Sequence, residues 1–428
     1  MSRAWFLGLL LFVVLMAGVI TLRGSELALA VPILLYWAYA LLWAPHELKV
    51  RISRRLSAER VVPGTPIDVR VTVLNAGGAL EELILDDAVP PGLELVEGSN
   101  HHLLSLGARQ SFEFTYTVQG ARGGYIFDTL RAQAGDLLGL LRITAEEHAE
   151  SHLLILPTIA RIKAVPIRPR RTRVYAGTIP ARVGGEGVEF FGVRQYEMGD
   201  SARRINWRAT ARHPESVFSN EFQQERVADV AVVLDGRDRA DLRVAGRALF
   251  DHAVVAAGTL ASALLQQGNR VGLLVYSQYL QWTYPGYGRV QRERILHALA
   301  NAAPGGSQIF EGLQYLPTRL FPPESQIVLV SPLVEDDLTT LVQLRARGYQ
   351  VLVICPNPVL FEMSNLPRPG SRYSTVDVAL AGRILTLERT AMLGRLRRAG
   401  VQVIEWNVAH PFDLAMRGAF RRMTVARG

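Results

Sequence analysis

The chain has 428 residues, which is enough for two or three domains that each bury a core. Hydrophobic residues make up 49% of it, and this share excludes an intrinsically disordered protein. The formal net charge is +8, and residues 161–213 alone hold 12 basic and 4 acidic side chains. The single cysteine, Cys355, excludes an intrachain disulfide framework and a zinc site built on CxxC pairs.

Two apolar stretches near the N-terminus predict a membrane hairpin. The first, Ala4 to Leu22, and the second, Leu27 to Trp43, contain no charged residue and are separated by RGSE. An α-helix rises about 1.5 Å per residue, so each stretch approaches the thickness of a hydrocarbon core of about 30 Å. A cleaved signal peptide is the alternative, but the first stretch is too long and the second follows at once. We therefore expect residues 1–45 to form two transmembrane helices, with residues 4–43 in contact with the lipid bilayer.

The basic residues around these stretches predict an orientation. The loop between the spans carries only Arg23, whereas several basic residues follow the second span: Lys49, Arg51, Arg54, Arg55 and Arg60. Positively charged flanks stay on the cytoplasmic side. The sequence thus predicts a multi-pass protein of the plasma (inner) membrane with residues 46–428 in the cytoplasm.

Residues 46–157 have the pattern of short β-strands. PIDVRVTVLNAGG alternates apolar and polar residues and ends in a turn signal, and later runs are broken by Pro, Gly and Asn. No segment of helical period interrupts them. This pattern favours an antiparallel β-sandwich domain that acts as a spacer or a binding module.

From residue 227 onward, almost continuously apolar strands alternate with helical runs. The strands are VADVAVVLD, RVGLLVYS, QIVLVSPL, YQVLVIC and VQVIEW, and helices are predicted over 244–267, 290–301, 309–320, 336–348, 384–400 and 411–423. Alternating β and α elements of this kind predict a mostly parallel sheet covered on both faces. Residues 227–428 are therefore expected to form a Rossmann-like α/β domain, in which ligands bind at the carboxyl ends of the strands.

An arginine-rich segment, residues 158–226, links the two predicted domains and contains GGEGVEFFGVRQYEMGDSARRINWRATARH. This run resembles the signature of a bacterial family known as domain of unknown function 58. The matching positions, called the signature residues below, are Gly187, Glu189, Phe190, Arg194, Tyr196, Gly199, Asp200, Arg203, Ile205, Trp207 and Arg212.

The resemblance implies a C-terminal domain similar to von Willebrand factor A domains. Many such domains bind Mg²⁺ through an Asp-x-Ser-x-Ser loop, a Thr and a further Asp, because this ion prefers hard oxygen ligands. Here the loop AVVLDGRDRADL keeps Asp235 but places Arg237 and Arg239 at the two serine positions. Ser307 matches the threonine, and Pro332 stands where the last aspartate is expected. Permanent positive charge opposes a divalent cation, so we expect a degenerate metal loop in which Asp235 pairs with Arg237 or Arg239.

The signature segment carries no pair of nucleophile and base, so we interpret it as structural. Asp200 is expected to cap a short helix that contains Arg203 and Trp207. Tyr196 and Trp207 are expected to pack on the α/β core, with the arginines paired to nearby acidic residues. The alternative is an arginine surface that docks an anion or a protein.

These features favour a membrane-anchored interaction or adaptor protein without enzymatic activity, metal or cofactor. The family resemblance implies a MoxR-type AAA+ ATPase as the protein partner, in complex assembly or a chaperone-like activity. The alternative is an Mg²⁺-dependent binding domain or enzyme that uses the loop at Asp235, with a site rebuilt from Asp238 and Asp241. Nucleic-acid binding is disfavoured, because the arginines lack the interleaved aromatic residues of a single-strand binder.

Overall fold

The computed structural model describes the backbone of residues 3–21, 24–43, 48–135, 142–162, 165–167, 173–213, 215–306, 320–365 and 375–425. Within these ranges the side chains of 3–4, 26, 40–43, 173–189, 191, 222–226, 375 and 422–425 are not described. The chain divides into two compact units, Met1–Leu156 and Pro157–Gly428. Each unit is described by itself.

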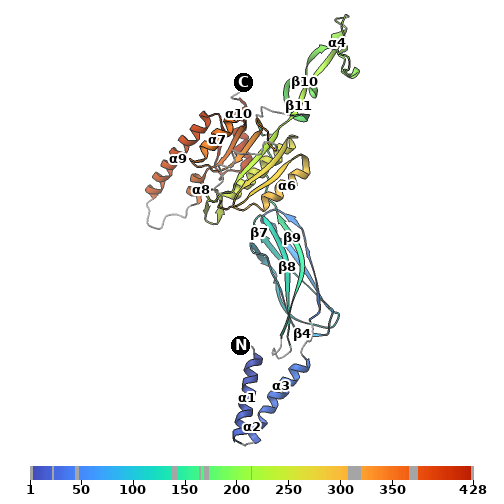
Figure 1. Cartoon of the computed structure of the whole chain (residues 1–428), viewed down its shortest axis with the longest axis vertical. Helices are drawn as coiled ribbons and strands as arrows, with labels where there is room; N and C mark the ends of the chain where they lie inside the picture. The colour runs from blue at the N-terminus through green and yellow to red at the C-terminus, as the bar shows by residue number, and fades with distance from the viewer. Residues whose placement is uncertain are drawn as a thin grey trace. The chain divides into compact units, whose positions relative to one another are not determined.

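Three helices lie at the N-terminus: α1 (Arg3–Thr21), α2 (Gly24–Ala28) and α3 (Ala30–Trp43). They form a hairpin with its bend at α2 (Figure 1), and at this bend a Cβ atom added to Gly18 would lie 2.8 Å from the Leu27 side chain. The second predicted span is thus divided between α2 and α3. Among the described residues, the one helix long and apolar enough to cross a membrane is α5 (Leu249–Gln266), which is mostly buried. The apolar parts of α1 and α3, Trp5–Thr21 and Ala30–Tyr39, are shorter.

Residues 50–135 and 142–155 form two facing sheets (Figure 1). One has the order β1-β3-β7-β5 and the other the order β2-β9-β8-β4-β6. Alternate residues of β3 are buried, as the apolar–polar alternation of this strand requires, and they pack against Leu83 and Phe127 of the other sheet. The strand bounds are β1 Val50–Leu56, β2 Arg60–Val61, β3 Ile67–Asn75, β4 Leu80–Asp87, β5 Leu93–Glu97, β6 His101–Leu106, β7 Ser111–Gly120, β8 Gly123–Gly135 and β9 Arg142–Ile155.

A buried ion pair crosses the core of this sandwich. The Arg54 guanidinium donates to both carboxylate oxygens of Asp87, and both side chains have no exposed surface. The Tyr116 hydroxyl donates to the same carboxylate at 2.6 Å. Burial, followed by the nearby charge of Asp87, raises the pKa of Tyr116 far above its usual value, so the hydroxyl keeps its proton. Arg54, one of the arginines after the second apolar stretch, is therefore a core residue.

The first two long strands of the second unit, β10 (Arg173–Gln195) and β11 (Phe218–Val227), form an antiparallel pair. The connection between these strands contains a 3₁₀ turn, η1 (Ala202–Arg204), and the short helix α4 (Trp207–Thr210). We call residues 173–227 the arm (Figure 1). The segment expected to be a linker is thus largely a two-stranded ribbon.

The rest of the second unit is an α/β domain around one sheet with the order β16-β15-β12-β17-β18-β19. All neighbouring pairs are parallel except β15 with the edge strand β16. The strand bounds are β12 Asp229–Asp235, β15 Arg270–Tyr276, β16 Leu280–Gly286, β17 Gln326–Val330, β18 Gln350–Pro356 and β19 Gln402–Trp406. A small hairpin of β13 (Arg243–Val244) and β14 (Arg247–Ala248) precedes α5, where the sequence predicted helix from residue 244. Strand β16 was not predicted.

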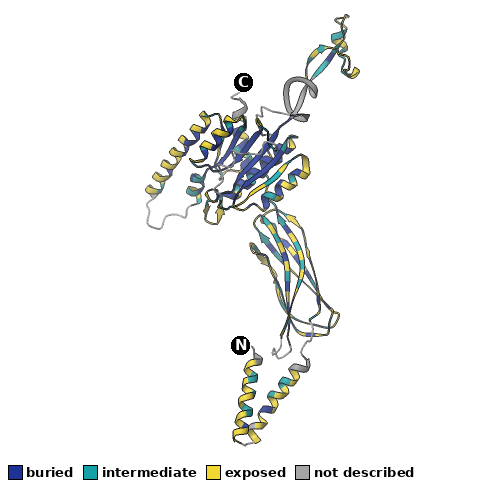
Figure 2. Ribbon diagram, in the orientation of Figure 1, coloured by how far each residue is buried: buried dark blue, intermediate teal, exposed yellow. Residues whose placement is uncertain are grey.

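Helices cover both faces of this sheet, and Figure 2 shows its central strands almost entirely buried. Side chains from α5, α6 and α10 pack with Val230, Val232 and Leu234 on one face. Side chains from α7 and α9 pack with Ala231 and Val233 on the other. The helix bounds are α6 Gly288–Ala300, α7 Asp337–Ala346, α8 Pro358–Asn365, α9 Thr375–Arg398 and α10 Phe412–Val425. Helix α8 was not predicted, and the helix predicted over 309–320 lies almost wholly outside the described residues.

The ion pair in the sandwich core generates a stability prediction. Asp87→Ala leaves the Arg54 guanidinium buried without its carboxylate, and we expect the free energy of unfolding to fall by about 3–5 kcal/mol. Urea denaturation followed by fluorescence measures this loss. Arg55→Ala, at the adjacent exposed position, is the control and is expected to change stability by less than about 0.5 kcal/mol. Equal losses in the two variants would contradict a special role for the pair.

Candidate functional site

The strand order places a crevice between the carboxyl ends of β12 and β17. The chain runs from β12 to β15 on one side and then crosses β12 to reach β17, β18 and β19 on the other. This crossing is a topological switch point, where open α/β sheets bind their ligands. Asp235 is the last residue of β12, and Ser331 directly follows β17. Gly236 fits at this turn because an added Cβ atom would lie 2.9 Å from the Tyr276 carbonyl oxygen.

Arg237 fills this crevice, and its guanidinium lies between two buried carboxylates. Its Nε and Nη2 atoms donate to the two oxygens of Asp235 at 2.8 and 2.7 Å. Its Nη1 and Nη2 atoms donate to the two oxygens of Asp337 at 2.9 Å each. Four of the five N–H groups of the guanidinium are thus directed at carboxylates, in the bidentate geometry that suits arginine. All three residues are at most 6% exposed.

Ser331 and the loop after β17 complete the cluster. The Ser331 hydroxyl donates to Asp235 Oδ2 at 2.6 Å and accepts the Leu333 N–H at 3.1 Å. The Val334 N–H donates to Asp337 Oδ2 at 3.0 Å. Leu333 has a positive φ of 53° although it is not glycine, a conformation that costs about 1–2 kcal/mol. Its bond to Ser331 and its buried side chain hold it there. We call Asp235, Arg237, Ser331 and Asp337 the switch-point cluster.

The electrostatics of the cluster favour a permanent guanidinium cation. Burial by itself lowers the pKa of Arg237, but the hydrogen bonds and charges of Asp235 and Asp337 outweigh burial and raise it above its usual value. Two carboxylates and one guanidinium leave a formal charge of −1, which the Ser331 hydroxyl and backbone N–H groups stabilise. The guanidinium therefore takes the place that a divalent cation takes between hard oxygen ligands.

The other residues predicted for this loop lie outside the cluster. Arg239 pairs with Asp336 at 3.4 Å, and both side chains are largely exposed. Asp241 binds Arg243 at 2.6 Å, and Asp238 is exposed. Ser307 lies outside the described residues. Within the described part of the chain, no group of three or more His, Cys, Asp or Glu side chains has a metal-binding arrangement.

A second buried arginine occupies the neighbouring carboxyl ends of β18 and β19. Arg389 of α9 donates to the Pro332 carbonyl oxygen, to Cys355 Sγ at 2.9 Å and to Glu405 at 2.8 Å. Burial raises the pKa of the Cys355 thiol to about 12, although the charge of Arg389 opposes this shift. The thiol is therefore protonated at neutral pH and is a poor nucleophile.

The signature residues of the arm hold one turn together. Arg194 binds Asp200 Oδ1 at 2.6 Å, and Asp200 Oδ2 accepts the Glu197 N–H. The Tyr196 hydroxyl donates to the Asp200 carbonyl oxygen, and Gly199 adopts a φ of 117° that favours glycine. The bond from the Glu197 N–H is the main reason that the pKa of Asp200 lies below its usual value. The sequence RQYEMGD thus folds as a self-contained turn.

Two expectations for the arm are wrong. Asp200 does not cap a helix, because Arg194 and the Glu197 N–H occupy its carboxylate; Asn206 caps α4 by accepting the Ala209 N–H. Trp207 is not packed on the core, because 71% of its surface is exposed. Ile205 pairs with Ser219 of β11, and Phe190 is 59% exposed. Gly187 and Glu189 lie in β10, in the part of this strand for which the structure describes the backbone alone.

Exposed side chains of two kinds gather in the connection between β10 and β11. Met198 and Trp207 are the most exposed apolar residues there. Arg203, Arg208 and Arg212 are also exposed. Within the part of the chain that the structure describes, none of the three forms an ion pair. We call these five residues the arm tip. An aromatic residue with arginines is the combination enriched at the centres of protein interfaces.

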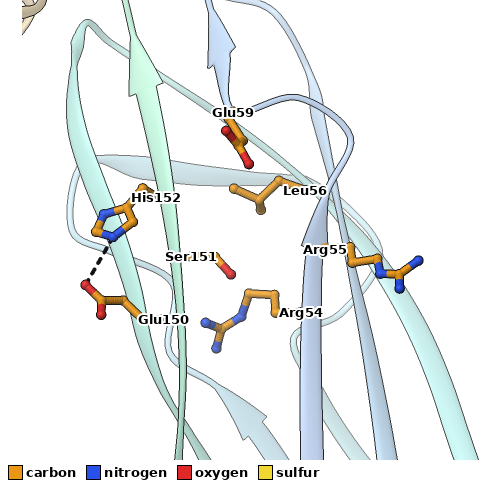
Figure 3. Close-up of a pocket in the computed structure, with 7 residues that line it drawn as sticks. All are labelled: Arg54, Arg55, Leu56, Glu59, Glu150, Ser151 and His152. Atoms are coloured by element: carbon orange, nitrogen blue, oxygen red, sulfur yellow. Dashed lines mark ion pairs between the residues drawn. The ribbon is translucent and has the colours of Figure 1, made fainter.

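The sandwich holds an open pocket of about 440 Å³ at the edges of its two sheets (Figure 3). It is lined by Arg54, Arg55, Leu56, Glu59, Glu150, Ser151 and His152. The His152 ring pairs with Glu150, and the Arg54 guanidinium is bound to Asp87. The pocket is thus lined by side chains of both charge signs, which gives no preference for one charged ligand.

A family model matches part of the arm and most of the α/β domain. The family model for Protein of unknown function DUF58 matches residues 192–397, from the end of β10 to the last turn of α9. The uncharacterized protein YeaD of Bacillus subtilis (strain 168) is 23% identical over 241 residues, which cover 55% of this chain. The matched part spans 58% of that relative's length. Both matches support the DUF58 family for this chain.

Solved structures resemble parts of the chain only weakly. The CARDB domain of a Pyrococcus furiosus protein, in complex with di-metal ions, is 14% identical with a TM-score of 0.20 over 26% of this chain and 97% of that one. A PapD-like domain of human CEP192 is 15% identical with a TM-score of 0.19 over 26% and 89%. The RO (RSR) protein of Deinococcus radiodurans is 13% identical with a TM-score of 0.21 over 30% and 27%. Likenesses at this level carry no inference about function.

The switch-point cluster generates a prediction about metal binding. Arg237→Ser removes the cation and leaves Asp235 and Asp337 facing each other, so we expect a loss of about 3–5 kcal/mol in stability. The two carboxylates and two hydroxyls that remain are ligands suited to a hard divalent cation. Millimolar Mn²⁺ is therefore expected to raise the melting temperature of the variant and to leave the wild-type protein unchanged.

The double variant Asp235→Asn, Arg237→Ser is the control, because it lacks one carboxylate and is expected to lose most of the response to Mn²⁺. Differential scanning calorimetry with and without the metal measures all three proteins. Saturable stabilisation of the wild-type protein by Mn²⁺ would show that Arg237 does not exclude a cation.

Proposed function

We propose that this chain is a membrane-anchored adaptor protein whose cytoplasmic part works by binding another protein. The observation that carries this proposal is the filled crevice at the switch point. The position where such a fold binds a ligand or ion holds the side chain of Arg237, tied to Asp235 and Asp337. A site with its cation built in has no open coordination position for a substrate. The exposed groups of the second unit are then the basis of its function.

The α/β domain is best interpreted as similar to a von Willebrand factor A domain. Its parallel strands have the order 2-1-3-4-5 with an antiparallel strand at one edge, and its first strand ends in Asp235. Ser331 at the end of β17 and Asp337 at the start of α7 add oxygen atoms around the same point. These features support a domain of the metal-binding class whose ion has been replaced by arginine.

The arm tip supports a protein as the ligand. Trp207 supplies a rigid apolar surface, while Arg203, Arg208 and Arg212 supply positive charge that an acidic surface complements. Arg194 and Asp200 fix the turn that precedes these residues, and Asn206 caps the helix that carries Trp207 and Arg208, so little order has to be gained on binding. For the partner we propose a MoxR-type AAA+ ATPase, which the resemblance to the DUF58 family implies.

The N-terminal helices support a membrane anchor. Large apolar side chains of α1 and α3 are exposed along their length, among them Trp5, Phe12, Ile20 and Leu35. Contiguous apolar surface of this size is costly in water and is matched by lipid. Helix α1 is about 28 Å long at 1.5 Å per residue, whereas α3 alone is about 21 Å long and would need α2 to extend it.

The anchor generates a topology prediction. We expect the chain to stay in the membrane pellet at alkaline pH and to be extracted only by detergent, because no salt or pH change releases a helix buried in lipid. In inverted inner-membrane vesicles, added protease should cleave the second unit, and in right-side-out vesicles it should not. Release at alkaline pH, or cleavage from the outer face, would refute the anchor or its orientation.

The arm tip generates a binding prediction. Purified full-length chain is immobilised in lipid nanodiscs, and a purified MoxR-type ATPase from the same genome is passed over it in an interferometer. Trp207→Ala and the pair Arg208→Glu, Arg212→Glu are each expected to weaken binding by at least about tenfold, as for residues at the centre of an interface.

The controls make the same chemical changes elsewhere. Tyr279→Ala removes an aromatic side chain that is also 71% exposed, and Arg397→Glu reverses an exposed charge on α9. Both are expected to bind as the wild-type chain does. No binding by the wild-type chain would reject the proposed partner, and equal losses in the controls would reject the arm tip.

A further inference from the structure

Helix α9 has two opposite sides, and only one of them packs against the rest of the α/β domain. Met392, Leu393 and Leu396 are buried in the core against the sheet, and Arg389 is buried over the ends of β18 and β19. Gly382 contacts Met363 of α8, with an added Cβ atom only 2.5 Å from its sulfur. At 100° per residue, these five positions fall on one side of the helix.

The opposite side of α9 carries an exposed apolar stripe. Leu380, Ile384 and Leu387 are 57%, 49% and 70% exposed, and Ala391 is exposed as well. Figure 2 shows exposed residues along most of this helix. The spacings of four, three and four residues are those of positions d, a, d and a of a heptad repeat. An exposed stripe with this repeat has the pattern of a coiled-coil seam, and we call it the seam below.

The heptad assignment agrees with the way the helix is attached. The α9 residues that pack against the rest of the domain occupy positions b, c and f. A two-stranded coiled coil leaves these positions on its outer side. The seam is bounded by Asp377 at the preceding a position and by Gly394 at the following d position. It therefore has four layers and a length of about 17 Å along the helix.

The charges beside the seam select the partner. Arg383 occupies position g and Glu388 the next position e, and both side chains are exposed. In a parallel pair, a g residue lies beside the e residue that is five positions later in the second helix. Two copies of α9 in register thus bring Arg383 of each next to Glu388 of the other. An antiparallel pair would place like charges beside each other and is disfavoured.

We propose that α9 is a homodimerisation helix that pairs in parallel with α9 of a second copy of this chain. Ile at an a position with Leu at d positions is the combination that favours two strands. Four layers alone bind weakly, so the pair depends on a high local concentration of chains, such as two copies in one lipid vesicle provide. The proposal does not require the partner or the arm-tip surface proposed above.

Disulfide crosslinking tests the pairing. The full-length chain with Leu380→Cys or Leu387→Cys is reconstituted in lipid vesicles and oxidised, and dimers are measured on non-reducing gels. Both residues are at d positions, where side chains of two parallel helices meet on the symmetry axis, so we expect dimers at both. Leu385→Cys is the control, because this residue is 45% exposed but lies on the other side of the helix. Native Cys355 is fully buried and should form none.

A charge exchange tests the register and the identity of the second helix. In the Leu380→Cys chain, Arg383→Glu and Glu388→Arg are each expected to lower the initial rate of dimer formation about fivefold, and the two together should restore it. Crosslinking at Leu385 as fast as at Leu380 would overturn the proposal. So would single charge reversals without effect, or crosslinks from Leu380 to a different protein in place of a second copy.

Discussion

The α/β domain depends on how a fully buried carboxylate is neutralised. Asp235 ends the central strand with 1% of its surface exposed, and an isolated charge in such a place would cost several kcal/mol. Arg237, two residues later, supplies the compensating charge and also reaches Asp337, 100 residues further along the chain. The same guanidinium therefore joins the first strand of the sheet to the start of α7. The same ion cluster accounts for three features of the nearby backbone. Gly236 leaves room for the turn after Asp235, the Ser331 hydroxyl donates to Asp235, and Leu333 adopts a left-handed conformation in the loop that follows.

A guanidinium and a divalent cation satisfy such carboxylates in different ways. A metal ion leaves coordination positions that water or a partner's carboxylate can take. The guanidinium is planar, and four of its N–H groups are directed at Asp235 and Asp337, so it offers little to an incoming ligand. The cluster is therefore a fixed structural link between the end of β12 and the start of α7. In the second unit, an exposed aromatic residue and exposed arginines lie together at the arm tip, which is the surface proposed above for binding a protein.

The sequence predicted the elements whose signals are local. Strands β12, β15, β17, β18 and β19 are buried apolar runs, and their residues were assigned from that property alone. Strand β16 was missed because LQWTYPG is half exposed at a sheet edge and shows no continuous apolar run. The pairing of Asp235 with Arg237 or Arg239 was expected from charge, and the structure shows Arg237. Asp337 and Ser331 were missed because their role depends on tertiary proximity. Asp200 was misassigned as a cap because Arg194 competes for its carboxylate, which no local pattern reveals.

The loop of residues 331–337 joins the switch-point cluster to α9. Ser331 and Asp337 belong to the cluster, while the Pro332 carbonyl oxygen accepts from Arg389 and Glu335 pairs with Arg395, both on α9. Any displacement of Asp337 must therefore be accommodated by the contacts that hold the buried side of α9. Because the loop holds Arg389 at position f and Arg395 at position e, it also helps to fix the direction of the a and d positions of that helix. The switch-point cluster is thus connected through this loop to the helix that carries the exposed apolar stripe.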